Sequence, residues 1–528
     1  MPALVTDKFR ILNTNSFVDS VNDSSNSYYV FVGLSNPAAN GYGRDSNWET
    51  ATPNPIDSVD RLNHFKSTML FGKKITSANI RRVIRRIDWT SGTTYEMYRP
   101  DYSVVNPSPK TNSLRLYDAD YYVMNSDFKV YICIDNGSSG ISTNGVSSQV
   151  EPTFTDLEPS KLSDGYTWKY LYSVSPSDIV KFDTTEYITV PNDWQTSTDS
   201  QIVAVRDNGN SDINENQIKK IYIENQGSGY GLSDGDTAKI VGDGSGGEVS
   251  LGIGPNGKIT GATVTSGGKG YTFAMIDLGT TPNNLPTSNA ELIPIIPPSK
   301  GHGFNIYEEL GADKVLIYAR FDDSTKDFPI DTKFAQIGIV KNPTVFDSTG
   351  INTTVYSTNE FSSLYAIKVD VSSGSLSPGD KIQQTNSNDG TAFGYVASYD
   401  VLDEDGTTAI IKYYQDRSLF YNPSTYGHVD FNNIGNYYDS SGTTLKFEST
   451  SEGITKTGGG FSGTVDTTFN GITTTISNKV INLGVTFNSG LANPEINSKS
   501  GDVIYIDNRK TVTRNNRQKE DVKIILEF

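Results

Sequence analysis

The first candidate for chemistry is the stretch GDGSGG at 242–247, whose spacing fits the G-x-G-x-x-G turn of dinucleotide-binding proteins. That turn needs a buried strand before it and a helix that begins on its last glycine, because the helix N-terminus holds the pyrophosphate. TAKIV at 237–241 supplies a strand, but the apolar residues from Val249 to Ile253 recur at every second position. This alternation, with a Pro-Asn-Gly turn at 255–257, predicts a hairpin. We therefore interpret the glycines as turn residues and expect no nucleotide or other cofactor.

The side chains that usually carry catalysis or bind metals are few and scattered. The three histidines, His64, His302 and His428, lie far apart without the spacing of metal ligands. The acidic turn DEDG at 403–406 lacks the ligand spacing and the distant glutamate of a calcium loop. Cys133 lies between two isoleucines, as buried structural cysteines do. We expect no catalytic residue and no metal site, and therefore no enzyme.

Composition and charge limit the partners. The chain of 528 residues carries a formal net charge of -17, and such a field repels a phosphate backbone, so we expect no nucleic-acid partner. The single cysteine excludes an intrachain disulfide and suits folding in a reducing cytosol. No apolar run approaches the length of a membrane span and no signal-peptide pattern opens the sequence, so we expect no membrane insertion. Abundant Tyr, Thr, Gly, Asn and Asp predict a mostly β protein with many turns.

One basic run, RRVIRR at 81–86, interrupts the acidic sequence. We interpret it as an interface or as a salt-bridge cluster in which the arginines pair with acidic neighbours. Aromatic side chains crowd nearby segments, where they fit a permanent protein interface, ordinary packing in a β-sheet, or a surface that binds sugars. The candidate contact or packing residues are Arg81, Arg82, Arg85, Arg86, Trp89, Tyr98, Tyr166, Trp168, Tyr170, Arg509 and Phe528.

The elements that must position these residues are mainly strands. Apolar or alternating runs predict strands at 27–34, 128–136, 165–175, 185–191, 314–321 and 335–343. SVDRLNHFKSTMLFG at 58–72 is the strongest helix signal, with Asp57 or Ser58 as N-cap and Gly72 as its end. DVKIILEF at 521–528 predicts a last strand that pairs within the core sheet.

Two segments differ in style from the rest. In the first, IKKIYIENQGSGYG begins at 218 and ITGATVTSGGKGYT begins at 259, which indicates two copies of a unit made of a strand, a glycine turn and a tyrosine. In the second, the pattern predicts five short strands of a small barrel or meander at 364–414, and an exposed loop or hairpin in the Gly- and Thr-rich stretch 453–476. The predicted domains are a first core segment at 1–205, a Gly/Tyr β-repeat insertion at 206–295, a second core segment at 296–345, a second β insertion at 346–494, and C-terminal core strands at 495–528.

Several segments, in a fixed order, carry a family resemblance. They are LVTDKFR at 4–10, FVGLSNPAANGYGRDSNWE at 31–49, RRIDW at 85–89, DGYTWKYLYSVSP at 164–176, TEYITVP at 185–191, FPIDTKFAQIGIVKNP at 328–343, and SGDVIYIDNRKTVTR at 500–514 through to the terminal KIILEF. With these segments the chain resembles the baseplate wedge proteins of the gene product 8 family of T4-like contractile-tailed bacteriophages. The two insertions are departures from that family.

The resemblance implies a mainly β, sandwich-like core. Because the strand-rich style stops near 206, resumes near 296 and returns at 500, we expect that core to be discontinuous, with little helix and with inserted small β modules. It implies a subunit of the virion's tail baseplate, made and assembled in the host cytoplasm, that forms a homodimer and joins other baseplate wedge proteins. It implies no enzyme activity, metal or cofactor. The alternative is a tail-associated receptor- or glycan-binding protein, in which the insertions contact glycan or the cell surface. A polysaccharide-degrading enzyme is the third interpretation.

Overall fold

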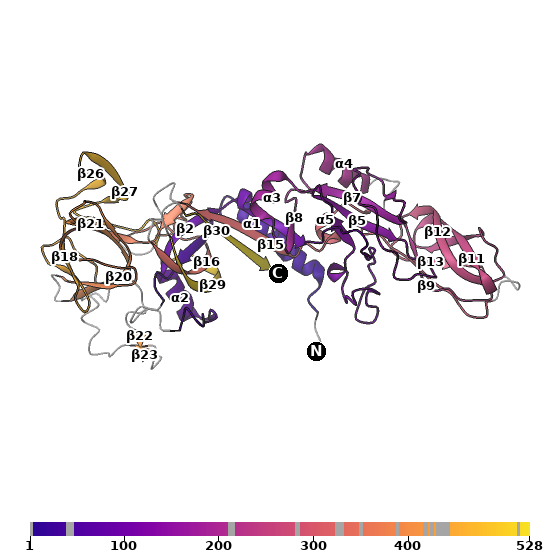
Figure 1. The fold of residues 1–528 in the computed structure, drawn as a ribbon, viewed down its shortest axis with the longest axis horizontal. Coiled ribbons are helices and arrows are strands. Elements are labelled where there is room, and N and C mark those ends of the chain that lie inside the picture. The colour runs from indigo at the N-terminus through magenta and orange to yellow at the C-terminus, as the bar shows by residue number, and fades with distance from the viewer. Residues whose placement is uncertain are drawn as a thin grey trace. The chain divides into compact units, whose positions relative to one another are not determined.

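The computed structural model describes residues 4–37, 47–209, 217–279, 286–322, 332–347, 352–386, 390–415, 421–422, 427–428, 444–514 and 518–528. Strands dominate the described chain and helices are few (Figure 1), which confirms the mainly β prediction. The described helices are α1 Asp7–Asn22, α2 Val59–Ser67, α3 Pro176–Phe182, α4 Ser200–Gly209 and α5 Ile306–Glu309, with 3-10 turns at η1 Ser77–Asn79, η2 Leu116–Asp118 and η3 Pro255–Gly257.

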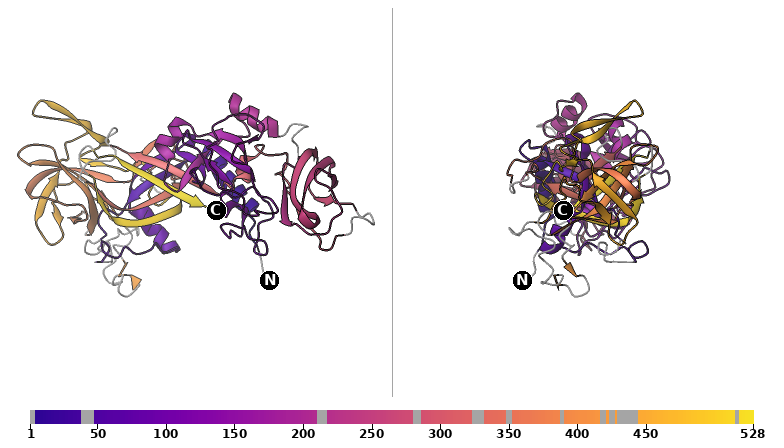
Figure 2. Two further views of the ribbon diagram at one scale, coloured as in Figure 1. Left: turned by 45° about the vertical axis from the view of Figure 1, so that its right-hand side comes forward. Right: turned by 90° about the vertical axis from the view of Figure 1, so that its left-hand side faces the viewer.

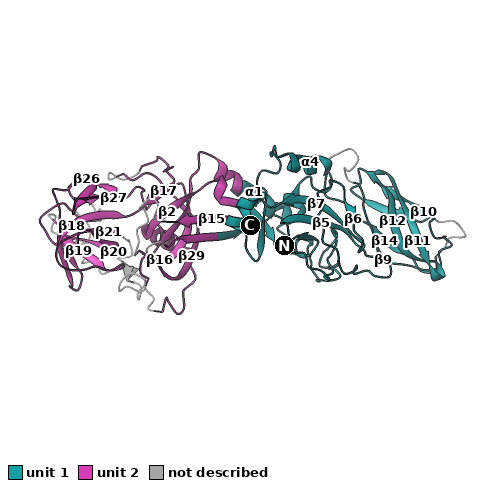
Figure 3. Cartoon of the chain, turned by 45° about the horizontal axis from the view of Figure 1, so that its top comes forward, with its two compact units in different colours: residues 1–17, 81–316, 524–528 teal, residues 18–80, 317–523 magenta. Residues whose placement is uncertain are grey.

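The chain forms two compact units, shown in different colours in Figure 3. Unit 1 comprises residues 1–17, 81–316 and 524–528, and unit 2 comprises residues 18–80 and 317–523. The predicted insertion at 206–295 falls within unit 1, and the predicted insertion at 346–494 falls within unit 2. The five domain boundaries drawn from the sequence stay a prediction.

Helix α1 is an element that the sequence pattern does not predict. Thr6 caps it, because its Oγ1 accepts a hydrogen bond from the Phe9 amide at 3.3 Å. Ile11 and Val18 are buried, whereas Phe9 and Leu12 are exposed. Apolar residues therefore lie on both faces of α1, and the one-sided periodicity that marks a surface helix is missing.

The core of unit 1 is built on a four-stranded sheet in the order β4-β5-β7-β6. Its strands are β4 Tyr122–Met124, β5 Lys129–Asn136, β6 Ser160–Lys161 and β7 Tyr166–Ser173. The residues from Val130 to Ile134 are all buried, so both faces of β5 are covered. Aromatic rings fill these faces: Tyr166 stacks on Trp168 at 5.3 Å between ring centroids. The strands predicted at 128–136 and 165–175 are confirmed.

Arg81, Arg82 and Arg85 of the arginine run lie on β3 Ile80–Arg85, and Arg86 directly follows it. β3 belongs to a four-stranded sheet of order β30-β15-β3-β8. The other strands are β8 Tyr187–Val190, β15 Lys314–Phe321 and β30 Glu520–Glu527. β30 is the predicted last strand, and its side chains at Val522 and Ile524 are buried while Lys523 is exposed. The apolar residues Val522 and Ile524 alternate with exposed charged residues, so one face of β30 is turned inward.

The first insertion contains a four-stranded sheet in the order β12-β11-β10-β13 and a strand pair, β14 with β9. The strands are β9 Ile221–Asn225, β10 Thr237–Gly242, β11 Ser245–Gly254, β12 Lys258–Lys269, β13 Ala274–Asp277 and β14 Glu291–Pro294. GDGSGG spans the end of β10, the turn and the start of β11, so a strand follows it where a nucleotide site needs a helix.

The two sequence copies in this insertion share their backbone conformation. Gly227 and Gly268 have φ of 60° and 61°, and Gly229 and Gly270 have φ of 80° and 75°. These left-handed values favour glycine, which explains why the glycines recur at matched positions. The tyrosine that follows each pair is buried.

The main sheet of unit 2 has five antiparallel strands in the order β17-β2-β1-β16-β29. They are β1 Tyr28–Gly33, β2 Met69–Ile75, β16 Lys333–Lys341, β17 Glu360–Ser362 and β29 Asp502–Thr513. One row of directly paired residues crosses all five strands: Phe361, Gly72, Phe31, Gly338 and Ile506. Large and small residues alternate along this cross-sheet row, and both phenylalanines are fully buried.

The predicted helix at 58–72 is wrong at its C-terminal end. Ser58 is the N-cap as predicted, but α2 ends at Ser67 and β2 begins at Met69. Gly72 is therefore a strand residue. A Cβ atom there would lie 2.2 Å from the Phe361 ring, so glycine is present to admit that ring.

The second insertion contains a closed barrel, because the order β21-β20-β19-β24-β25-β18 is completed by pairing of β18 with β21 (Figure 2). Its strands are β18 Tyr365–Gly374, β19 Lys381–Thr385, β20 Thr391–Val401, β21 Thr408–Tyr414, β24 Ile454–Lys456 and β25 Phe461–Val465, and β28 Leu491–Ala492 adds to β18. The described residues of 364–414 supply four strands, so the prediction of five is wrong.

The Gly- and Thr-rich stretch 453–476 is not simply an exposed loop or hairpin. It supplies two barrel strands, in which Ile454 and Phe461 are buried. Only its end forms a separate hairpin, of β26 Gly471–Ile476 with β27 Lys479–Phe487. A short strand pair, β22 Tyr421–Asn422 with β23 Gly427–His428, completes the described strands.

We expect Gly338→Ala to lower the free energy of unfolding of unit 2 by about 1–3 kcal/mol, since overpacking forces shifts of this cost. The new Cβ would lie 2.4 Å from Phe31 Cζ and 2.7 Å from the Tyr505 carbonyl oxygen. The matched control is Gly453→Ala, where the nearest atom is 3.8 Å away. Urea unfolding followed by tyrosine and tryptophan fluorescence measures both, and equal midpoints for the two variants would contradict the prediction.

Candidate functional site

The arginines of β3 are bound by acidic and aromatic neighbours within unit 1. The Arg81 Nε donates to both carboxylate oxygens of Asp178 at 3.0 Å, and its guanidinium lies over the Phe182 ring. The run RRVIRR is thus a salt-bridge cluster in this structure, which is one of the two interpretations that the sequence left open.

Arg82 is the most deeply buried of the four, with 4% of its surface exposed. Its Nε donates to Asn15 Oδ1 at 2.8 Å, and its Nη1 donates to the Asn192 carbonyl at 3.1 Å. The guanidinium carbon lies 4.4 Å from the centre of the Tyr307 ring. Such a side chain ties three segments of unit 1 together and is closed to any partner.

Arg85 and Arg86 reach the surface. The Arg85 guanidinium pairs with Asp120 at 3.0 Å and donates to the Asp118 and Ala119 carbonyls. Arg86 pairs with Asp183 at 2.7 Å and with Asp88 at 2.9 Å. Both arginines line a surface pocket.

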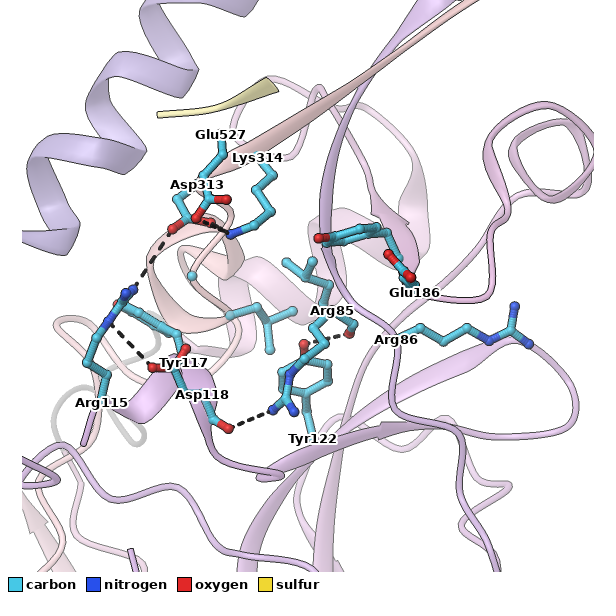
Figure 4. A pocket seen from close by; sticks show the side chains of 14 residues that line it. Arg85, Arg86, Arg115, Tyr117, Asp118, Tyr122, Glu186, Asp313, Lys314 and Glu527 are labelled. Carbon is cyan, nitrogen blue, oxygen red and sulfur yellow. Dashed lines mark hydrogen bonds and ion pairs between the residues drawn. The ribbon is translucent and has the colours of Figure 1, made fainter. Parts of the chain in front are cut away.

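This pocket has a volume of about 390 Å³ and lies wholly within unit 1 (Figure 4). Its walls come from β3, from the segment around η2, from the residues before β8, from the start of β15 and from the end of β30. The lining side chains are four cations, four carboxylates, three tyrosines and a few apolar residues: Arg85, Arg86, Arg115, Lys314, Asp118, Glu186, Asp313, Glu527, Tyr117, Tyr122, Tyr187, Ile84 and Leu310.

Ion pairs and hydrogen bonds order the pocket walls. Lys314 bridges Asp313 at 2.8 Å and Glu527 at 3.2 Å, and these charges raise the pKa of Lys314 although burial opposes them. The Tyr122 hydroxyl donates to the Arg85 backbone carbonyl at 2.6 Å, which ties the Tyr122 side chain to the end of β3 (Figure 4). The pocket is therefore a preformed, mixed-charge cavity that suits recognition of a charged group.

The structure brings only two of the candidate residues from the sequence to this pocket. The side chains of Tyr98, Trp168 and Tyr170 are buried in the core of unit 1. For these three residues the structure agrees with the alternative of ordinary packing in a β-sheet. The Tyr166 hydroxyl, also buried, donates to the Val146 carbonyl at 2.7 Å. The half-buried Trp89 donates to Ser148 Oγ at 3.0 Å.

The last two candidates also lie away from the pocket lining. Arg509 stands on β29 in unit 2 and pairs with Asp507 at 2.6 Å. The ring of Phe528 packs against Phe17 at 5.5 Å between centroids, and its amide donates to the Asp313 carbonyl. Their role as contact residues stays a prediction.

Sequence reasoning missed most of the pocket lining. Arg115 and Tyr117 lie in a loop segment without a periodic pattern, and nothing in their neighbours marks them. Lys314 and Glu527 gave a usable signal, because each stands at the end of a predicted strand. Charged residues at strand ends gather at one edge of a sheet when the strands are neighbours.

A second polar cluster lies inside unit 1. His302 Nδ1 and Glu309 Oε1 are 2.6 Å apart, and the Gly303 amide donates to the other Glu309 oxygen. Nearby, the Lys169 ammonium is buried and donates to the Leu157 carbonyl at 2.6 Å and to Asn208 at 3.0 Å. Each of these groups has a partner within the unit, as buried polar groups require.

The described residues contain no group of three or more His, Cys, Asp or Glu side chains placed to hold a metal ion. Within the same described ranges, no helix has the length and apolar character that crossing a membrane requires. Cys133 is buried on β5, and burial raises the pKa of its thiol well above the ordinary value.

The fold and the pocket together define a mainly β protein in which many charged side chains of unit 1 pair with one another, and which has a mixed-charge pocket at the surface of that unit. No protein-family model matches the chain. The chain does resemble the baseplate wedge protein gp8 of Enterobacteria phage T4, with 25% identity over 219 residues. The match covers 36% of this chain, and the chain spans 60% of the length of that protein.

We expect Arg82→Lys to lower the free energy of unfolding by about 1.5–3 kcal/mol, because an ammonium cannot replace the forked hydrogen bonds of a buried guanidinium. Arg509→Lys is the matched control, since Arg509 is more than half exposed and keeps its ion pair as a lysine. That change should cost less than about 1 kcal/mol. Chemical denaturation with near-ultraviolet circular dichroism compares the two. If Arg82→Lys leaves the free energy of unfolding unchanged, the contacts of Arg82 add little to stability.

Stability should rise with pH above about 8 because of Lys169. Burial lowers the pKa of Lys169 from 10.5 to about 8, so the unfolded chain binds more protons between these values. Stability then increases with pH in this window, by on the order of 1–3 kcal/mol when the full shift is realised. Lys169→Met should remove this slope, whereas Lys161→Met, at an exposed position, should leave it. Urea unfolding at several pH values up to about 9.5 tests the difference. If stability depends on pH in the same way in both variants, Lys169 is not the group responsible.

Proposed function

We propose that this protein is a structural subunit of a contractile-tail baseplate wedge and that it acts through protein–protein contacts. The likeness to the baseplate wedge protein of phage T4 carries the proposal, because it extends over 219 residues. The protein is then a component of the virion, located in the tail baseplate after assembly in the host cytoplasm. Other baseplate wedge proteins are its partners.

The internal chemistry of unit 1 supports a structural role. Arginines that could serve a reaction instead join segments of the fold, as Arg82 does with Asn15 and Asn192. Arg99 is likewise buried, pairs with Asp101 at 2.6 Å and lies 3.9 Å from the Tyr222 ring centre. Side chains committed in this way make a rigid body, and rigid bodies lose less entropy when they assemble.

The proposal includes a discontinuous core with two outward modules and a homodimer as the assembling species. The pairing in the five-stranded sheet supports the core, because β1, β16 and β29 come from the three predicted core segments and lie side by side. The homodimer is proposed on general grounds, since symmetric dimers are the commonest soluble homo-oligomers.

The alternative is a tail-associated protein that binds a receptor or glycan through its insertions. It lost support when the aromatic side chains that suggested it, such as Trp168 and Tyr170, were found in the core of unit 1. One observation still favours it: Phe273 of the first insertion is 61% exposed. Exposed aromatic rings provide the stacking surface that sugars use, so the insertion remains the place to test for glycan binding.

We expect a gold-labelled antibody against this chain to decorate the baseplate end of purified tails from the phage that encodes it. Mass spectrometry of the same tails should detect the chain together with other wedge proteins. An antibody against the tail tube is the matched control and should label elsewhere. Intact tails that lack the chain would contradict the proposal, and labelling of extended tail fibres would favour the receptor-binding alternative.

A further inference from the structure

Lys169 of β7 is a buried amine whose hydrogen-bond partners are neutral. Only 3% of the residue is exposed. Its Nζ donates to the Leu157 carbonyl at 2.6 Å and to Asn208 Oδ1 at 3.0 Å, and no described carboxylate forms an ion pair with it. Because burial penalises the charged form, the pKa of Lys169 falls from 10.5 to about 8. A sizeable fraction of this amine is therefore neutral in mildly alkaline solution, and a neutral, desolvated lysine is a nucleophile.

Helix α4 holds Asn208 beside this amine. Asp199 caps the helix, because its Oδ1 accepts hydrogen bonds from two backbone amides of the first turn. Val205 of α4 is fully buried in the core of unit 1, and α4 lies beside β7 (Figure 1). The fold therefore positions the Asn208 carboxamide against Lys169 before any reaction begins, which is the condition for an efficient reaction between two groups of one chain.

Glu158 holds the other end of the same carboxamide. Its Oε1 accepts a hydrogen bond from Asn208 Nδ2 at 2.9 Å, and its Oε2 lies 3.6 Å from Lys219 Nζ. The carboxamide thus has an amine on its oxygen side and a carboxylate on its nitrogen side. A carboxylate in this position can accept a proton and return it to the amide nitrogen.

A small hollow adjoins these groups. Lys169, Glu158, Lys219 and His302 are among the residues that line it, and its volume is about 10 Å³. This is about the space that one water molecule needs, and ammonia is of similar size. A small leaving group that is released beside Glu158 therefore has a place to go.

We propose that Lys169 and Asn208 form an intramolecular isopeptide bond, with Glu158 as the residue that transfers the proton. The neutral Nζ attacks Asn208 Cγ, so that a C–N bond forms and the carbonyl electron pair moves onto Oδ1. Glu158 takes the proton that the attacking nitrogen loses and gives it to Nδ2. The Cγ–Nδ2 bond then breaks, the carbonyl forms again and ammonia leaves. The reaction balances without a co-reactant, because an amine and a primary amide give a secondary amide and ammonia.

The bond joins a strand of the unit 1 core to the helix that ends where the first insertion begins. It closes the loop of chain between Lys169 and Asn208, and a cross-link of this kind stabilises a fold mainly by restricting its unfolded state. The reaction consumes the amine, so the pH dependence expected for Lys169 belongs to the chain before the bond forms. This inference goes beyond the proposed function and does not depend on it.

Intact-mass spectrometry of the full-length chain tests the proposal. After incubation of the folded chain at about pH 9, where most of the amine is neutral, we expect a mass below that of the sequence by one ammonia. A tryptic digest should then contain residues 162–181 joined to residues 207–219, without cleavage after Lys169. A chain kept unfolded in urea during the incubation should not give the joined peptide, because the fold no longer holds the two groups together.

Two variants and a control assign the roles. Lys169→Met should give no joined peptide, since it lacks the nucleophile. Glu158→Gln should slow the joining by about a hundredfold or more, because the amide cannot transfer the proton. Glu158 is exposed, so this variant keeps its fold. The matched control is Glu404→Gln, also at an exposed position, which should react at the normal rate. The joined chain should melt about 5–10 °C above the Glu158→Gln chain.

Asn208 is followed by a glycine, and an asparagine in this context can also lose ammonia by closing on its own backbone to a succinimide. That product leaves Lys169 free, persists in Lys169→Met and forms in the unfolded chain. Loss of ammonia in this pattern would overturn the inference, and so would an unchanged mass of the folded chain after the incubation. Joining at the normal rate in Glu158→Gln would overturn the role of Glu158. In each of these cases the proposed function stands.

Discussion

Phe31 lies between two glycines, Gly72 on one neighbouring strand and Gly338 on the other, and its ring is fully buried. The ring occupies the space above Gly338 that a Cβ atom would need. A slip of one residue would turn Phe31 to the other face and place a side chain where the ring now lies. The register of the five-stranded sheet in unit 2 therefore depends on this alternation of large and small residues. The barrel is connected to this sheet at two points. β17 of the sheet leads directly into β18 of the barrel, and where the chain leaves the barrel the Glu495 amide donates to the Ser362 carbonyl of β17.

An acidic chain has to hold its carboxylates without strong self-repulsion, and this chain does so by placing arginines among them. Arg81, Arg85 and Arg86 each hold at least one aspartate at 3.0 Å or less. The excess negative charge then remains at exposed positions, where water screens it. This unpaired negative surface charge favours binding of positively charged partners and disfavours binding of negatively charged ones.

The sequence predicted the strands well where local pattern and burial agree. KVLIYARF at 314–321 coincides with β15 at both ends, because its apolar stretch from Val315 to Ala319 is short and rich in residues that favour strands. Gly72 misled the helix prediction, since a glycine that admits a ring on a neighbouring strand looks the same in sequence as one that ends a helix. For 453–476 the hairpin alternative was right for β24 and β25, which pair with each other, but their place in the barrel was not predicted because few apolar residues mark them.

Only a small part of the candidate site could be predicted from the sequence. Arg85 and Arg86 stand in an evident run, but Arg115, Lys314 and Glu527 come from distant segments that only the folded chain brings together. Spacing along a sequence carries no information on such a meeting unless the topology is known. Helix α1 was not predicted for a different reason. Apolar residues lie on its exposed face as well as on its buried face, so the sequence lacks the one-sided apolar periodicity on which helix prediction depends.

The order of strands in unit 2 also determines when each strand can find its pairing partner during synthesis. When β1 and β2 leave the ribosome they can pair with each other, but β16 follows β1 by about 300 residues, which takes roughly 15–60 s of translation. The outer partner, β29, arrives later still. A lone two-stranded ribbon is marginally stable in water, and this one carries Tyr29 and Phe31 on a face that has nothing to cover it. Nascent chains on neighbouring ribosomes thus expose unpaired strand edges for much of their synthesis, so the yield of folded protein depends on how well those edges are kept apart.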